Sequence, residues 1–195
     1  MRPFKELSDR IDELSRRFLD PQIPNETDPA FQPDVDGIAA FRVLAHAAIE
    51  EWLEKSAREE IAKLSAKSPV RAAHRLLLLA QVLDISIPRM VPFDGPALKK
   101  AFEAVLREAG KWIDDNNGIK TGSFCVLTLM CGGPPDEVDF ALTSALDAYG
   151  KSRGDVAHKG LTAVRTVRAP SAEKADAINL IQAIDKFWAT MVRVS

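Results

Sequence analysis

The chain has 195 residues and a formal net charge of -2; 46% of its residues are hydrophobic and 28% are charged. This balance predicts one globular domain with a hydrophobic core, and it excludes a protein whose whole surface is a basic nucleic-acid footprint. The longest apolar runs, "LLLLAQVL" and "CVLTLMC", are too short to span a bilayer. The N-terminus lacks the apolar core of a signal peptide, so we expect a cytoplasmic protein without membrane association.

Helical periodicity begins at the N-terminus. The segment "FKELSDRIDELSRRFL" repeats apolar residues three and four apart, which predicts an amphipathic helix. The polar, proline-rich segment "DPQIPNETDPAFQPDVDG" follows; it favours a long loop, either an arm that contacts a neighbour or a disordered stretch. Residues 38–67 then predict one long helix. We therefore divide the chain into an N-terminal helix and polar loop (1–36) and a main helical domain (37–195).

Five further helices are predicted in the main domain. "VRAAHRLLLLAQVLD" follows Pro69, and "ALKKAFEAVLREAGKWI" follows a capped start at Asp94 and Pro96. Asp136 is expected to cap "EVDFALTSALDAYGKSR", and the last helix is "AEKADAINLIQAIDKFWATMV". "SFCVLTLMC" fits a strand or a buried helix; we interpret it as a helix because no second strand signal offers a partner. The fold class predicted is an all-α bundle.

For most of the histidines and cysteines, the sequence predicts a role in packing rather than in catalysis or metal binding. His46 lies among alanines in the long helix, and His74 begins an apolar run, so both are expected to be packing histidines. Cys125 and Cys131 form no CxxC pair, and no histidine lies at a zinc-ligand spacing from them. We therefore predict neither a metal site nor a cofactor.

The stretch "YGKSRGDVAHKG" differs from the rest of the chain. From Tyr149 to Pro170 there are five Lys/Arg against one acid. The planar fork of Arg153 suits phosphate oxygens, and His158 can move protons near neutral pH. Asp155 lies three positions before His158, so on a helix its carboxylate can hold the ring tautomer. A cationic helix end that compensates the helix dipole is the competing interpretation.

Three segments of the chain together resemble HEPN domains. "LDAYGKSRGDVAHKG" is similar to the family hallmark, an arginine followed after four to six residues by a histidine, in an all-α bundle. "FRVLAHAAIEEWLE" resembles the family's long second helix, and "NNGIK" resembles a turn of the branch called RiboL-PSP-HEPN. The resemblance covers roughly Phe41 to His158 and the last helix. It implies a bundle with a four-helix core plus additional helices.

The resemblance also implies an activity. Many HEPN domains are metal-independent ribonucleases that work as toxins, phage-defence effectors or RNA-processing factors, and many are homodimers whose two Arg-His motifs form one composite site. Arg153 would bind the scissile phosphate of an RNA substrate, and His158 would act as base or acid, leaving a 2′,3′-cyclic phosphate. An antitoxin or regulatory protein would be a further partner. Glu50, in the long helix packed beside the motif helix, would support the catalytic residues without contacting the RNA; the other interpretation places it on a solvated helix face. The candidate RNA-binding residues are Lys151, Lys159, Arg165 and Arg168.

The chain departs from the family at two positions. The residue after the motif arginine is often polar in active members, and here it is Gly154, with Asp155 as the candidate to take its place. Some toxin members carry a modified tyrosine two residues after the histidine, where this chain has Gly160. The alternative function is therefore a non-catalytic HEPN module that binds RNA, a nucleotide or a protein partner.

Overall fold

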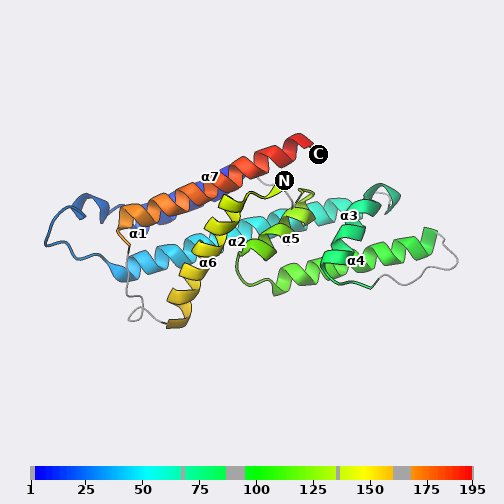
Figure 1. Ribbon diagram of the computed structural model, residues 1–195, viewed down its shortest axis with the longest axis horizontal. Helices are drawn as coiled ribbons and strands as arrows, with labels where there is room; N and C mark the ends of the chain where they lie inside the picture. Colours follow the sequence, from blue (N-terminus) through cyan, green and yellow to red (C-terminus); the bar gives the residue numbers. More distant parts are fainter. Residues whose placement is uncertain (1–2, 67–68, 87–94, 135–136, 160–167, 195) are drawn as a thin grey trace.

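The computed structural model describes residues 3–194, except 67–68, 87–94, 135–136 and 160–167. Within these residues it contains seven α-helices, one short 3-10 helix and no strand, which confirms the all-α prediction (Figure 1). No helix in this described part is long and apolar enough to cross a membrane. The helices are α1 (Phe4–Phe18), α2 (Val35–Ser65), α3 (Pro69–Val82), α4 (Gly95–Asp115), α5 (Thr121–Cys131), α6 (Phe140–Lys159) and α7 (Pro170–Val194).

The long helix α2 is the centre of the bundle. Its 31 residues extend about 46 Å at about 1.5 Å per residue, and α1, α4, α5, α6 and α7 all pack against it. Figure 1 shows α7 lying along α2, α6 crossing it, and α3, α4 and α5 gathered around its C-terminal half. The side chain of Asp34 accepts the Gly37 N–H at 2.9 Å and so caps the start of α2, three residues earlier than the sequence pattern indicated.

The N-terminal helix α1 shares the main core. Leu7, Ile11 and Leu14 are almost fully buried and belong to the same apolar cluster as the residues of α2 and α7. The ring of Trp52 in α2 lies 5.7 Å from Phe4 of α1 and 5.0 Å from Trp188 of α7. Aromatic contacts at this spacing add to the burial energy, so three helices are joined at one point.

The segment between α1 and α2 is held by specific polar contacts. Gln22 is buried; its amide oxygen accepts the Asp34 N–H at 2.8 Å, and its amide nitrogen donates to the Phe18 carbonyl at 2.7 Å. The Glu26 carboxylate accepts the backbone N–H and the hydroxyl of Ser171, both at 2.5 Å, and so caps α7. The described loop therefore packs on its own chain rather than lying disordered.

Three local predictions have clear outcomes. Residues 121–131 are a helix, as expected for "SFCVLTLMC", and Gly132 (φ 90°) ends it in the left-handed region that glycine tolerates. The start of α6 is Phe140, where Asp139 accepts the Leu142 N–H at 3.4 Å; the helix therefore begins later than a cap at Asp136 would require. His74 is exposed on α3, so its prediction as a packing histidine was wrong. Asp94 and Asp136 themselves lie outside the described residues.

Candidate functional site

The Arg-x4-His motif lies on the second half of α6. The helix is continuous from Phe140 to Lys159, so the helical backbone assumed for Arg153, Asp155 and His158 is present. Positions 155 and 158 are one turn apart on it, as the tautomer argument requires. The side chains of residues 152–159 lie outside the described part, and so does Arg165.

Two of the candidate RNA-binding side chains are described. Lys151 is exposed on α6. Arg168 is exposed just before α7 and forms an ion pair with Asp176 of that helix. The Arg168 guanidinium is therefore already paired within the chain.

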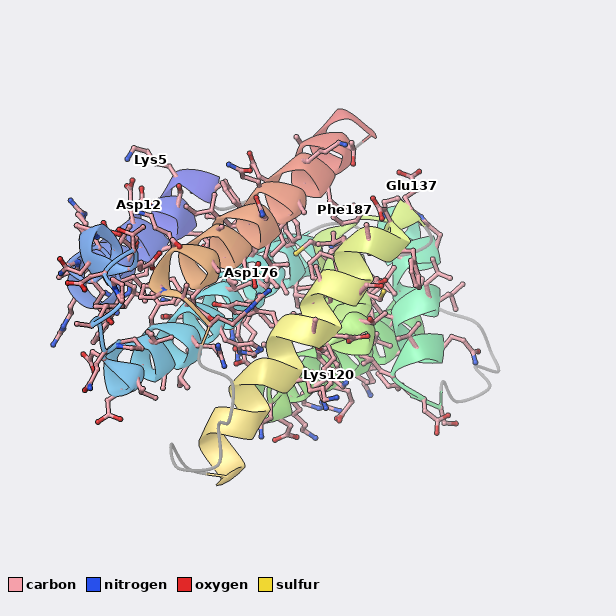
Figure 2. The ribbon with its side chains drawn as sticks, turned by 60° about the vertical axis from the view of Figure 1, so that its left-hand side comes forward. Lys5, Asp12, Lys120, Glu137, Asp176 and Phe187 are labelled. Carbon is pink, nitrogen blue, oxygen red and sulfur yellow. The ribbon has the colours of Figure 1, made fainter. Side chains whose placement is uncertain are left out.

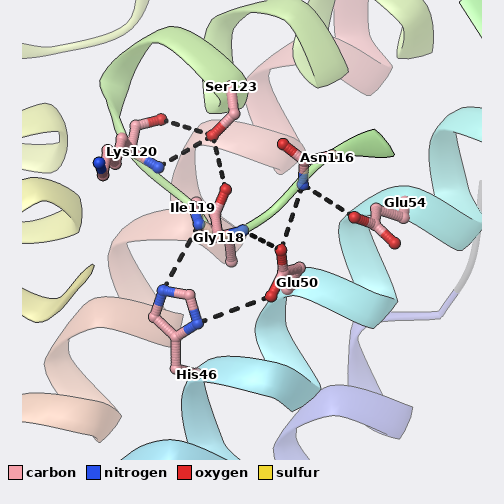
Figure 3. Close-up of polar contacts among 8 residues, drawn as sticks. All are labelled: His46, Glu50, Glu54, Asn116, Gly118, Ile119, Lys120 and Ser123. Carbon is pink, nitrogen blue, oxygen red and sulfur yellow. Dashed lines mark hydrogen bonds and ion pairs between the residues drawn. The ribbon is translucent and has the colours of Figure 1, made fainter. Parts of the chain in front are cut away.

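His46 is the buried centre of a polar cluster beneath α6. Its side chain is 2% exposed, and its Nε2 atom accepts the Ile119 N–H at 3.4 Å (Figure 3). An accepting Nε2 leaves the ring proton on Nδ1, which faces the Glu50 carboxylate at 3.8 Å. The ring also stacks on Tyr149 of α6 with centroids 6.2 Å apart. The prediction of a packing histidine is confirmed for His46.

Glu50 binds the turn between α4 and α5. Its carboxylate accepts the Gly118 N–H and, at 3.3 Å, the side-chain amide of Asn116, which also donates to Glu54 at 2.8 Å (Figure 3). Gly118 has φ 97°, which a non-glycine residue adopts only with strain. Glu50 is thus not a solvated side chain: it holds the segment 116–119 and faces His46.

Two further contacts fix α6 against this turn. The Asp147 carboxylate accepts the Thr121 N–H at 2.9 Å and the Thr121 hydroxyl at 2.7 Å. These hydrogen bonds lower the pKa of Asp147. One turn later, Gly150 lies so close to the turn that an added β-carbon would be 2.8 Å from the Ile119 carbonyl oxygen. The segment that precedes the motif is therefore fixed in position by residues 119–121.

A buried ion pair joins α2 to α7 beside Tyr149. Arg42 donates to Glu173 through Nε (2.7 Å) and Nη2 (2.6 Å), and both side chains are less than a tenth exposed. These hydrogen bonds raise the pKa of Arg42. Burial, and to a lesser degree the Glu173 charge, raises the pKa of the Tyr149 phenol well above its ordinary value. The charged side chains of Arg42 and Glu173 and the protonated phenol of Tyr149 thus form one buried cluster under α6.

Sequence reasoning missed three of these residues. Arg42 occupies an apolar position of α2, one residue after Phe41 and three before Ala45, and a charge at such a position signals a buried partner. Its partner Glu173 is 131 residues away, so no local pattern links the two. Asn116 stands inside the quoted "NNGIK", but its contacts with α2 depend on tertiary packing.

The described residues contain no group of three or more His, Cys, Asp or Glu side chains placed to hold a metal ion. Comparisons with known proteins add no identity: no protein-family model, curated protein or solved structure matches this chain.

Proposed function

We propose that this protein is a metal-independent endoribonuclease of the HEPN type, acting as a homodimer in the cytoplasm. The observation that supports the proposal is the convergence of the three segments that carry the resemblance. His46 and Glu50 of "FRVLAHAAIEEWLE", the Asn116–Ile119 turn and Tyr149–Gly150 of the motif helix all meet in one cluster. If the three segments resemble one family fold, they are expected to share a site, and these contacts are consistent with that expectation.

The cluster positions the catalytic helix without taking part in the reaction. Glu50 and His46 hold the turn 116–119, and the turn fixes α6 through Thr121 and Gly150. Arg153 follows Tyr149 by four residues, about 6 Å along the helix at about 1.5 Å per residue. Glu50 is accordingly a positioning residue, and the catalytic roles fall to Arg153 and His158.

The chemistry is transesterification at the RNA backbone. Arg153 neutralises the scissile phosphate, and one His158 takes the proton of the ribose 2′-hydroxyl. The 2′-oxygen attacks phosphorus, the bond from phosphorus to the 5′-oxygen breaks, and the leaving oxygen takes a proton from a histidine. Asp155 holds the His158 tautomer. The products are a 2′,3′-cyclic phosphate and a 5′-hydroxyl, and a substrate without the 2′-hydroxyl is not cut.

The homodimer supplies the second acid-base group. One chain contributes a single Arg153 and a single His158, whereas the reaction needs a base and an acid at once. Two copies related by a two-fold axis bring two motifs to one site. Activity of this kind suits a toxin, a phage-defence effector or an RNA stress factor, with an antitoxin or regulatory protein as its control.

The test is cleavage of single-stranded RNA in EDTA by wild type, Arg153→Ala and His158→Ala. Lys186→Ala, an exposed lysine on α7, is the matched control for loss of a surface charge. We expect cleavage by wild type and the control, and loss of at least about a hundredfold in the two motif variants. Intact RNA with a folded wild-type dimer would contradict the proposal and favour the non-catalytic binding module. Sedimentation as a monomer at micromolar concentration would contradict the composite site.

A further inference from the structure

A pocket of about 300 Å³ lies between α6 and α7. Figure 2 labels Asp176, which lies on α7 where this helix faces α6. The pocket is next to the buried Arg42–Glu173 pair, since Glu173 forms part of its wall. Its lining residues are Ala145, Ala148, Tyr149, Arg168, Glu173, Asp176, Asn179 and Leu180.

Tyr149 lines this pocket, and its hydroxyl is buried and has no hydrogen-bond partner among the described residues. The side chain is 9% exposed. More than nine in ten buried polar groups in native proteins are paired, and an unpaired one destabilises the fold. A small movement of the Tyr149 side chain would bring its hydroxyl to the pocket, where a ligand atom would complete its hydrogen bonding.

The charges of the wall select the kind of ligand. Glu173 is paired with Arg42, and Asp176 with Arg168, so the four charges sum to zero. A carboxylate has about four acceptor positions on its two oxygens, and one arginine uses only part of them. Asp176, whose side chain is partly exposed, therefore offers spare acceptors to N–H donors, and the neutral wall gives a phosphate no net attraction.

The remaining wall residues favour a flat, neutral ring. Ala145 and Ala148 are small side chains one turn apart on α6, and Leu180 faces them from α7. Asn179 is exposed and its amide both donates and accepts hydrogen bonds. A small apolar wall with an amide, a phenol and carboxylate acceptors matches the face and the edge of a nucleobase.

We propose that the pocket between α6 and α7 binds a nucleobase that carries an exocyclic amine, with the amine directed to the Asp176 carboxylate. That the base belongs to an RNA rests on the ribonuclease proposed above. Positions 145, 149 and 153 repeat every four residues and so lie along one face of α6. The base would thus bind one helical turn from the position of Arg153, and the pocket would choose the nucleotide beside the scissile phosphate.

Cytidine and uridine are the matched probes, because they differ where cytidine has an amine and uridine a carbonyl oxygen. We expect ligand-observed NMR to show adenosine and cytidine binding to the full-length protein about tenfold or more tightly than uridine. Asn179→Ala and Tyr149→Phe should each weaken cytidine binding about fivefold or more, while Gln182→Ala, an exposed amide on α7 outside the pocket wall, should not. Equal binding of cytidine and uridine, or wild-type binding by both pocket variants, would overturn the proposal.

RNA cleavage separates this proposal from the one it rests on. If wild type cuts RNA in EDTA and the base preference at the cut site relaxes in Asn179→Ala and Tyr149→Phe, both proposals are supported. If RNA is cut and the preference stays the same in both variants, the pocket assignment is overturned and the ribonuclease stands. If RNA is not cut but cytidine binding depends on Asn179 and Tyr149, the base pocket stands and the ribonuclease is rejected.

Discussion

Gly150 lies directly against Ile119: a β-carbon at position 150 would come within 2.8 Å of the Ile119 carbonyl oxygen, and 3.7 Å from the Nε2 atom of His46. A glycine inside a helix ordinarily costs stability, because its unfolded backbone has more freedom to lose. Here it allows the motif helix to approach the turn that His46 and Glu50 hold in place. The contact links the positions of α2, α5 and α6.

Gly150→Ala is therefore expected to destabilise the protein, although alanine is the better helix former. The added methyl group meets backbone rather than a flexible side chain, so α6 or the turn must shift. The matched control is Gly110→Ala in the interior of α4, where an added β-carbon meets nothing within 4 Å. Urea unfolding should show a loss for Gly150→Ala and a gain of about 0.5–1 kcal/mol for Gly110→Ala. Equal gains at both positions would show that the close approach is absent.

Glu50→Ala should destabilise the protein by about 1–3 kcal/mol, because the Gly118 N–H and the Asn116 amide lose their common acceptor. Glu51→Ala, which removes an exposed carboxylate paired with Lys55, should change stability by less than about 0.5 kcal/mol. Hydrogen exchange at the Gly118 amide gives the local readout: it should accelerate in Glu50→Ala only. Unchanged exchange at Gly118 would contradict the role given to Glu50.

Arg42→Met should be among the most destabilising substitutions in the chain, at about 3–5 kcal/mol, because it leaves the Glu173 carboxylate buried without its partner. The double variant Arg42→Met/Glu173→Met removes both charges and should recover most of that loss. Chemical denaturation of the two variants measures the difference. A double variant as unstable as Arg42→Met would mean that the charges themselves, and not their pairing, support the fold.

Tyr149 should resist ionisation at alkaline pH. Burial raises its pKa above the ordinary value near 10, so the folded state favours the protonated phenol. The free energy of unfolding is then unaffected by this group below about pH 10 and falls as the pH rises above it. Because the chain contains a single tyrosine, the tyrosinate absorbance near 295 nm reports on Tyr149 alone. Its ionisation should coincide with loss of helical circular dichroism; ordinary titration near pH 10 in a folded protein would contradict the buried phenol.

The helices follow from local sequence patterns, and their contacts do not. Periodicity located α1 as it stands, and the absence of a partner strand gave the right interpretation of residues 121–131. The start of a helix is harder to place when the sequence offers two possible N-terminal capping residues. For α6, Asp139 rather than Asp136 precedes the first turn. The exposure of His74 shows a further limit, because an apolar run does not reveal which of its neighbours face solvent.

The candidate site likewise has a part that can be predicted from local sequence and a part that cannot. The Arg153–His158 spacing is local and can be read directly, whereas the supporting cluster needs contacts between residues far apart in the chain. Glu50 could be singled out in the sequence, but its actual partners, Asn116 and Gly118, depend on how α4 and α5 pack on α2. The pocket wall of Tyr149, Asp176 and Asn179 comes from two helices and has no sequence pattern of its own.

The most direct test of the ribonuclease is an end-labelled DNA oligonucleotide that contains one ribonucleotide, incubated in EDTA with wild type and with His158→Ala. The account predicts that wild type cuts only after the ribonucleotide and leaves a 2′,3′-cyclic phosphate and a 5′-hydroxyl, and that His158→Ala leaves the strand intact. Cleavage at deoxynucleotides, ends of another kind, or equal cleavage by His158→Ala would contradict it.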